Sequence, residues 1–281
     1  MNPRVMLVPA LAAAALAPGA PATPGTRAGG VAPREPVVVT VVASDYRFEL
    51  PTTLPAGPTT FRLVNRGKQV HHLALLRLTP GRTLAQVRVA LARGGPEPAW
   101  LTDEGGPNAL DPGNAGEVVV DLRPGTYVLA CFVPAADGVP ALLHGMLREL
   151  TVTAARGKAA PGPVPDDTVT FAGYGFRLTA PLTPGEHRLL VRNADARAHE
   201  LVLFRLAPGK TAAQFLAWAA SMRAPAPGAF EGGVSGLGPG RENEAIVQLH
   251  RGRYVLACFL DAPDGRPHTA HGMVTEVQVA D

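Results

Sequence analysis

The sequence predicts an all-β protein made of two similar antiparallel sandwiches, each with one short inserted helix. Three observations predict this fold: short runs rich in β-branched residues, frequent Gly and Pro turns, and one pattern that occurs twice. The 281 residues include 31 Gly and 29 Pro without a collagen-like period. The length allows two domains of about 100–150 residues, and 46% hydrophobic residues are enough to form their cores. Only 17% of the residues are charged, which excludes a coiled coil or a charged disordered chain.

The second half of the chain repeats the first. The matching residues keep their order: Asn65 and His71 recur as Asn193 and His199, and YVLACF at 127–132 recurs at 254–259. Self-similarity over so long a period predicts two copies of one structural unit. We expect a first half at 36–154 and a second half at 167–281, joined by a Pro-rich linker at 155–166.

Short alternating or β-branched runs, separated by turns such as PAG, NRGK and RPG, predict the strands of each half. Those of the first half are 36–43, 59–65, 73–78, 117–122, 126–132 and 147–153. Those of the second half are 167–173, 187–193, 201–206, 244–249, 253–259 and 274–279. Helical patterns at 83–94 and 211–222 follow matching turns, and Thr83 and Thr211 are placed to cap them.

The N-terminal residues resemble a targeting segment. Residues 1–22 combine Arg4, an apolar run at 5–16 and small residues before a plausible cleavage point. As a helix the run spans about 18 Å, too short for a hydrocarbon core of about 30 Å. We expect a signal peptide, then a flexible lead-in at 23–35, and a periplasmic or secreted chain without a membrane span. The alternative is an uncleaved membrane anchor.

Soft metal-binding side chains occur at matching places in both halves. In the second half, His199 begins one predicted strand and Cys258 ends another, and His268, His271 and Met273 follow before the last strand. Strand ends of a sandwich can meet at one pole. A thiolate, two imidazoles and a thioether form the ligand set of a blue-copper site. Zinc favours more thiolates or carboxylates, and iron–sulfur clusters need several cysteines.

Each half resembles a cupredoxin, the plastocyanin-like family of small copper proteins. The pattern is an Asn before a His, then G-x-Y-x-x-x-C, then H-x-x-x-x-M with Gly before Met. It is carried by Asn193 and His199, by 252–258, and by 268–273. The resemblance implies Greek-key sandwiches, copper ligation by His199, Cys258, His268 and Met273, electron transfer, and a redox partner protein. Nine residues separate Cys258 from His268, more than is usual in the family.

The first half departs further from this pattern. Its candidate metal ligands are His71, Cys131, His144 and Met146. Ala141 stands where the second half has His268, and His144 matches His271. Residues two apart in an extended segment point to the same side, so we expect that His144 could join Met146 at one metal. The second half should therefore bind copper more tightly than the first. His72 is a spare imidazole that corresponds to Glu200.

Two simpler interpretations of the cysteines stay open. Each is explained equally well as a small buried hydrophobic residue. A Cys131–Cys258 disulfide would require the equivalent poles of both halves to face each other. Exported proteins usually avoid free thiols. Two cysteines at equivalent positions of the repeat therefore favour a role as metal ligands.

The missing motifs argue against an enzyme. Copper nitrite reductases and two-domain multicopper oxidases need His-x-His pairs and a His beside the blue-copper Cys, whereas Cys131 and Cys258 are flanked by Ala and Phe. Hydrolase and nucleotide-binding motifs are also missing. A net charge of +3 without a basic block gives no support for nucleic-acid binding. The predicted function is electron transfer or copper holding, and the alternative is a metal-free double sandwich used for binding or envelope structure.

Overall fold

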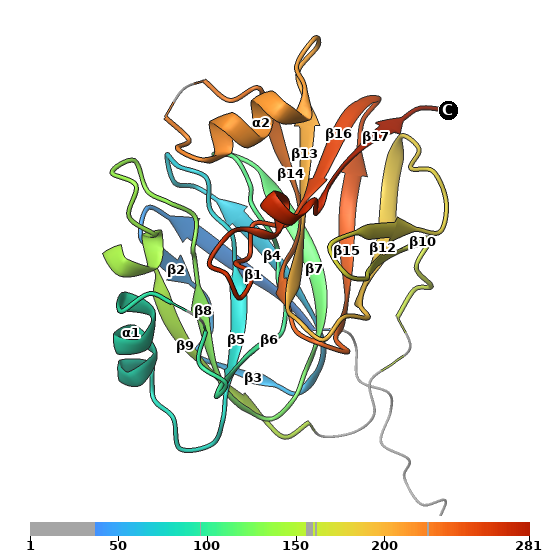
Figure 1. Cartoon of the computed structure of the whole chain (residues 1–281). Helices are drawn as coiled ribbons and strands as arrows, with labels where there is room; N and C mark the ends of the chain where they lie inside the picture. Colours follow the sequence, from blue (N-terminus) through green and yellow to red (C-terminus); the bar gives the residue numbers. More distant parts are fainter. Residues whose placement is uncertain (1–36, 96, 156–159, 161, 224) are drawn as a thin grey trace, which may run out of the picture. The chain divides into compact units, whose positions relative to one another are not determined.

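The computed structural model describes residues 37–281 apart from 96, 156–159, 161 and 224, and Figure 1 shows its arrangement of strands. The predicted all-β class is confirmed, with two α-helices among the described residues. The predicted signal peptide at 1–22 and lead-in at 23–35 lie outside these residues. Within the described part, no helix has the length and apolar character that crossing a membrane requires.

Each of the twelve predicted runs contains a strand, and five further strands, the longest at 228–237, lie outside these runs. The elements of the first half are β1 (Val37–Ser44), β2 (Arg47–Glu49), β3 (Thr53–Pro55), β4 (Gly57–Asn65), β5 (Ala74–Leu78), α1 (Leu84–Ala92), β6 (Leu101–Asp103), β7 (Ala115–Leu122), β8 (Gly125–Ala130), the 3-10 helix η1 (Ala141–His144) and β9 (Leu147–Thr153). Those of the second half are β10 (Asp167–Phe171), β11 (Phe176–Leu178), β12 (Gly185–Asn193), β13 (His199–Leu206), α2 (Ala212–Ala219), β14 (Gly228–Leu237), β15 (Glu242–Leu249), β16 (Gly252–Ala257), the 3-10 helix η2 (His268–His271) and β17 (Val274–Val279).

Most strand pairs of the first half have a counterpart in the second, although the parallel pair β3–β9 has none among the described residues. The first strand of each runs parallel to a later one, β1 with β4 and β10 with β12. The remaining equivalent pairs are antiparallel: β4 with β7 and β12 with β15, then β5 with β8 and β13 with β16, then β8 with β9 and β16 with β17. The fold is cupredoxin-like. The His-bearing strand β13 and the Cys-bearing strand β16 are neighbours in one sheet, which positions the site described below.

The sheets of the two halves are not separate, contrary to the expectation of two independent sandwiches. One eight-stranded sheet has the order β11-β10-β12-β15-β7-β4-β1-β2 and so contains strands of both halves (Figure 1). The junction is antiparallel, with Glu244–Ile246 of β15 opposite Glu117–Val119 of β7. Pairing satisfies backbone groups that two free strand edges would leave unpaired. The described residues of 37–281 belong to one compact unit, and the division at 36–154 and 167–281 stays a prediction.

Alternating burial and capped helices explain why these segments fold as they do. Phe61 and Leu63 of β4 are fully buried, while Arg62 between them is exposed. Both predicted caps are confirmed, because the Thr83 and Thr211 side chains accept the backbone N–H of the third helical residue in a capping box. Each helix packs on the sheet of its own half, because Val87 of α1 lies in one buried cluster with Leu76 and Leu78 of β5, and Phe215 of α2 lies in another with residues of β13.

We predict that the shared sheet makes residues 37–281 unfold in one cooperative step. The chain has one tryptophan in each half, Trp100 and Trp218. In each of the variants Trp100→Phe and Trp218→Phe, the fluorescence of the remaining tryptophan reports the unfolding of one half. Within each variant, the urea midpoint of this fluorescence should equal the midpoint of the far-ultraviolet circular dichroism. Two separate midpoints within either variant would show that the halves unfold independently.

Candidate metal centre

A buried asparagine fixes the turn that presents His199. The Asn193 side chain donates to the carbonyl oxygens of Arg197 and Leu237, each at 2.7 Å, and its own oxygen accepts the Asp195 N–H at 2.9 Å. These bonds close the turn between β12 and β13, so that β13 begins at His199 with its ring buried. Asn65 makes the corresponding bonds before His71 in the first half. This explains the Asn of the sequence pattern.

The long loop after Cys258 folds back onto the cysteine. Within it, the Ala262 N–H donates to the Arg266 carbonyl at 2.8 Å, and the His268 N–H donates to the Leu260 carbonyl at 2.8 Å. The Cys258 N–H donates to the Met273 carbonyl at 3.2 Å, which ties the end of β16 to the residue before β17. The nine intervening residues therefore return His268 to Cys258.

Three donor atoms converge at this pole. His199 Nδ1 lies 3.1 Å from His268 Nδ1, and His268 Nδ1 lies 3.2 Å from Cys258 Sγ. All three atoms lie within 4.8 Å of one another, and each side chain is at most 1% exposed. Met273 is fully buried in the hydrophobic cluster that contains Cys258. The structure thus brings together His199, Cys258 and His268 from the predicted set, and places Met273 in the same buried region.

Burial determines the charge of these groups. It lowers the pKa of His199 to about 4, with His268 beside it as a further cause, and it also lowers the pKa of His268. Burial, together with the carboxylate of Glu200, raises the pKa of the Cys258 thiol. At neutral pH the metal-free site therefore contains two neutral imidazoles and a protonated thiol.

The donor atoms fit a soft metal ion. The two Nδ1 atoms face each other at 3.1 Å, and there is room for only one proton between them. At least one of these nitrogens is therefore unprotonated and carries a free lone pair. The Nε2 atoms of these rings do not belong to this group; both are buried without a hydrogen-bond partner in the described part of the chain, and His199 Nε2 lies 3.8 Å from Asp195 Oδ2. Two imidazole nitrogens and a thiolate around one point form the ligand set of a type-1-like copper site.

The second histidine of the HTAH segment points elsewhere. His271 Nε2 lies 3.1 Å from Asp264 Oδ1, and its ring stacks on Tyr174 with centroids 4.8 Å apart. Its side chain is 25% exposed, whereas His268, three residues earlier, is buried. The assignment of His268 rather than His271 to the site agrees with the sequence pattern.

The first half brings together only part of its predicted set. His71 Nδ1 lies 3.7 Å from Cys131 Sγ, and Met146 is fully buried nearby in the same cluster. His71 Nε2 lies 3.0 Å from Asp45 Oδ1, which leaves Nδ1 facing the sulfur. Ala141 occupies the place of His268. The described residues of this half therefore offer one imidazole and one thiol at the position of the site.

His144 does not join this group, and the expectation that it would is corrected here. Its Nε2 lies 3.2 Å from Asp137 Oδ1, and its ring packs against Tyr46 with centroids 4.6 Å apart. The expectation assumed an extended segment, but residues 141–144 form the 3-10 helix η1, and Gly145 then turns the chain at a φ of 112°. Residues 144 and 146 therefore do not share a side. His144 instead occupies the place of His271.

Both cysteines are free and buried, so the structure does not contain the alternative Cys131–Cys258 disulfide. Sequence analysis did not assign a role to the residue after each site histidine. The backbone N–H of Glu200 donates to Cys258 Sγ at 3.3 Å, and that of His72 to Cys131 Sγ at 3.5 Å. The correspondence of His72 with Glu200 in the repeat was the signal that could have indicated a shared role.

No family model and no curated protein matches the chain. Among solved structures it is similar to a reduced auracyanin from Roseiflexus castenholzii, with 22% identity, 42% of this chain and 97% of that chain covered, and a TM-score of 0.28. Auracyanin A, a "blue" copper protein from Chloroflexus aurantiacus, has 22% identity, coverages of 42% and 99%, and a TM-score of 0.31.

Similarity over most of the chain is found with enzymes. A copper-containing nitrite reductase from Thermus scotoductus has 12% identity, with 88% of this chain and 62% of that chain covered, and a TM-score of 0.23. A blue copper oxidase from Nitrosomonas europaea has 14% identity, coverages of 87% and 86%, and a TM-score of 0.24. The prediction that this chain is not an enzyme is contradicted by these similarities and is withdrawn.

We predict that neither cysteine of the folded, metal-free chain reacts readily with a thiol reagent at pH 8. Both are fully buried, and burial raises the pKa of Cys131 to about 12 and that of Cys258 as well. A raised thiol pKa leaves little reactive thiolate at this pH. A colorimetric disulfide reagent should label both cysteines in guanidinium and neither in buffer over the same time. Rapid labelling of Cys258 in the folded chain would contradict the described burial.

Proposed function

We propose that the chain is a copper-binding protein with one type-1-like copper site in its second half and an electron-transfer or copper-holding role. The observation that carries this proposal is the convergence of three buried side chains, His199, His268 and Cys258, each with a ligand atom within 4.8 Å of the other two. Met273 would supply the weak fourth ligand. When bound, copper would supply one-electron redox chemistry.

The residues around the site prepare it for a metal ion. The two imidazoles are neutral, so no proton has to leave them before they bind. The Cys258 thiol would release its proton on binding, and the Glu200 N–H at 3.3 Å would then donate to the thiolate. The Asn193 turn and η2 hold the two rings in place before binding, which reduces rearrangement.

The wider organisation is also proposed on the sequence evidence. Two cupredoxin-like domains at 36–154 and 167–281, with a linker at 155–166, are supported by the internal repeat and the equivalent strand pairing. Export through a signal peptide at 1–22 to the periplasm or the medium is supported by the apolar run and the small residues. An electron-transfer role would require a redox partner protein.

A metal-free role is favoured only for the first half. There Ala141 removes one imidazole, and His144 is directed to Asp137. Cys131 is fully buried, as a small hydrophobic core residue would be. We propose that this half contributes mainly as a sandwich scaffold and binds copper more weakly than the second half.

We predict that His268→Ala removes the intense thiolate-to-copper absorption obtained on adding Cu(II) and weakens copper binding at least about 10–100-fold. This variant gives the second half the donor set of the first, because Ala141 already stands at the equivalent position. His271→Ala is the matched control in the same short helix, and its spectrum should resemble that of the unchanged protein. Equal loss in both variants would show that the two imidazoles were assigned incorrectly.

We predict that the two cysteines differ in the same assay. Cys131→Ser should keep the absorption and the uptake of one copper ion, because its half lacks the second imidazole. Cys258→Ser should lose the absorption. Both substitutions are made in the full chain, since the halves share a sheet. If the Cys131→Ser variant loses the band, or if each variant loses half of it, the first half is an equal copper site.

A further inference from the structure

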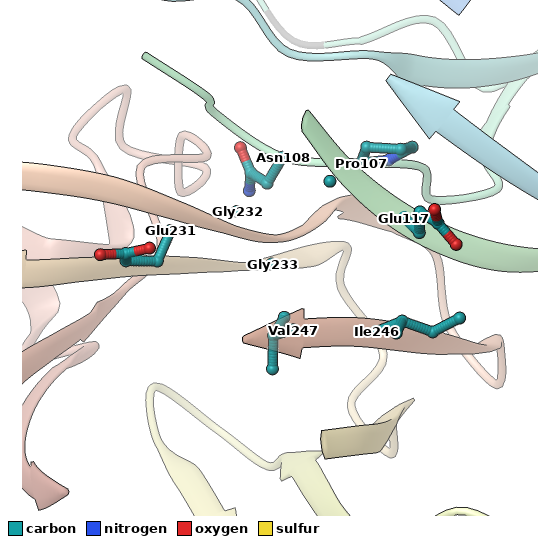
Figure 2. Close-up of a pocket in the computed structure, with 9 residues that line it drawn as sticks. Pro107, Asn108, Glu117, Glu231, Gly232, Gly233, Ile246 and Val247 are labelled. Atoms are coloured by element: carbon teal, nitrogen blue, oxygen red, sulfur yellow. The ribbon is translucent and has the colours of Figure 1, made fainter. Parts of the chain in front are cut away.

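A chain of buried polar side chains joins the surroundings of the two cysteines. Its central member is Asn108, which belongs to the first half but lies along β14 of the second half. Its backbone N–H donates to the Gly233 carbonyl at 3.2 Å, and Pro107 pairs with Val234 as an isolated bridge. Figure 2 shows Asn108 and Pro107 beside Gly232 and Gly233 at a small cavity between these segments.

On the second-half side, Asn108 contacts Glu200, the residue after the ligand His199. The Asn108 Nδ2 donates to Glu200 Oε2 at 3.0 Å. The other carboxylate oxygen, Oε1, accepts the N–H of Phe259 at 2.8 Å, and Phe259 directly follows Cys258. Glu200 also donates its backbone N–H to Cys258 Sγ. One residue therefore holds both the cysteine sulfur and the peptide that follows it.

In the first half, His72 makes the equivalent contacts, with an imidazole in place of the carboxylate of Glu200. Its Nε2 accepts the Phe132 N–H at 2.8 Å, and its backbone N–H donates to Cys131 Sγ. Asn108 raises the pKa of the His72 ring, against the larger lowering that burial causes, so the two side chains are close. We call the side chains of His72, Asn108 and Glu200 the Asn108 bridge, because they lie between the peptide after Cys131 and the peptide after Cys258.

The composition of the bridge indicates more than packing. Asn108, Glu200 and His72 are only 1%, 5% and 8% exposed. Equivalent positions of the repeat hold an imidazole in one half and a carboxylate in the other, and the Asn108 amide donates to the carboxylate. A buried carboxylate is costly unless its oxygens are paired, and here both oxygens accept a hydrogen bond. Fully satisfied buried networks favour one arrangement of their surroundings.

We propose that Asn108, although it lies in the first half, is a positioning residue for the copper site of the second half, acting through Glu200 on Cys258. The inference rests on the proposed copper function. Without the Asn108 Nδ2 group, the buried Glu200 Oε2 loses its side-chain hydrogen-bond donor. The side chain that replaces Asn108 then lies opposite this oxygen. The carboxylate then reorients, its bond to the Phe259 N–H is lost, and the backbone that holds the Cys258 sulfur loosens. The copper site thus depends on contact between the halves.

The test uses the full chain with the isosteric substitution Asn108→Asp, which places a carboxyl oxygen opposite Glu200 Oε2. Ser235→Ala is the matched control, because Ser235 is equally buried on β14 and bonds the Leu73 carbonyl across the same contact, without touching the bridge. Amide exchange of Phe259 is measured by NMR without copper. We expect at least about tenfold faster exchange in Asn108→Asp and no change in Ser235→Ala, with Asn108→Ala measured in the same way if the first variant does not fold.

The copper-loaded protein supplies the second readout. Asn108→Asp should shift the absorption band and change the Cu(II)/Cu(I) equilibrium about tenfold, which is about 59 mV for a one-electron couple. The double variant Asn108→Asp with Glu200→Gln restores a donor opposite an acceptor and should recover part of both effects. Asn108 Nδ2 also donates to the Leu201 carbonyl at 3.2 Å and the Val234 carbonyl at 3.1 Å, and the double variant does not restore these bonds. Recovery in the double variant therefore assigns the effect to the contact between Asn108 and Glu200.

The two hypotheses fail in different ways. If the unchanged protein takes up no copper, the proposed function is wrong, whereas the exchange of the Phe259 amide still decides whether the bridge exists. If copper binds but Asn108→Asp matches Ser235→Ala in amide exchange, absorption and potential, the positioning role of Asn108 is overturned.

Discussion

Two imidazole nitrogens that face each other at 3.1 Å inside the protein, with a cysteine sulfur 3.2 Å from one of them, are the constraint on which the site depends. Burial keeps both rings neutral and removes water as a partner. The protein therefore holds three potential metal-donor atoms together, and in the absence of metal their partners are one another. The Asn193 turn, the strand pair β13–β16 and the loop that returns His268 all serve to keep this arrangement closed.

The first half shows what happens when one member of the group is missing. Its Asn65 turn, its His71 and its Cys131 are in the equivalent places, and the backbone around the cysteine is bonded in the same way. With Ala141 in place of an imidazole, His71 keeps a partner in Asp45. The same framework thus brings two imidazoles and a thiol together in one half, and one imidazole and a thiol in the other.

The sequence was informative where local chemistry decides the structure. Alternating and β-branched runs predicted the strands, Thr83 and Thr211 predicted the helix caps, and the family pattern identified His268 rather than His271. The junction of β7 with β15 was not predictable, because strand-edge pairing involves backbone groups that every residue has. The position of His144 was missed because a 3-10 helix and Gly145 replace the assumed extended segment. The contact of Asn108 with Glu200 depends on that same junction of the halves and carries no sequence motif.

X-ray absorption spectroscopy at the copper edge of the loaded full-length protein tests the central claim most directly. A copper ion held by His199, His268 and Cys258 should give two nitrogen neighbours at about 2.0 Å and one short copper–sulfur distance, as in His₂Cys trigonal sites. The sulfur contribution should disappear in Cys258→Ser and persist in Cys131→Ser. A shell of oxygen and nitrogen neighbours without sulfur, in protein that has taken up copper, would show that the metal binds elsewhere and would contradict the account.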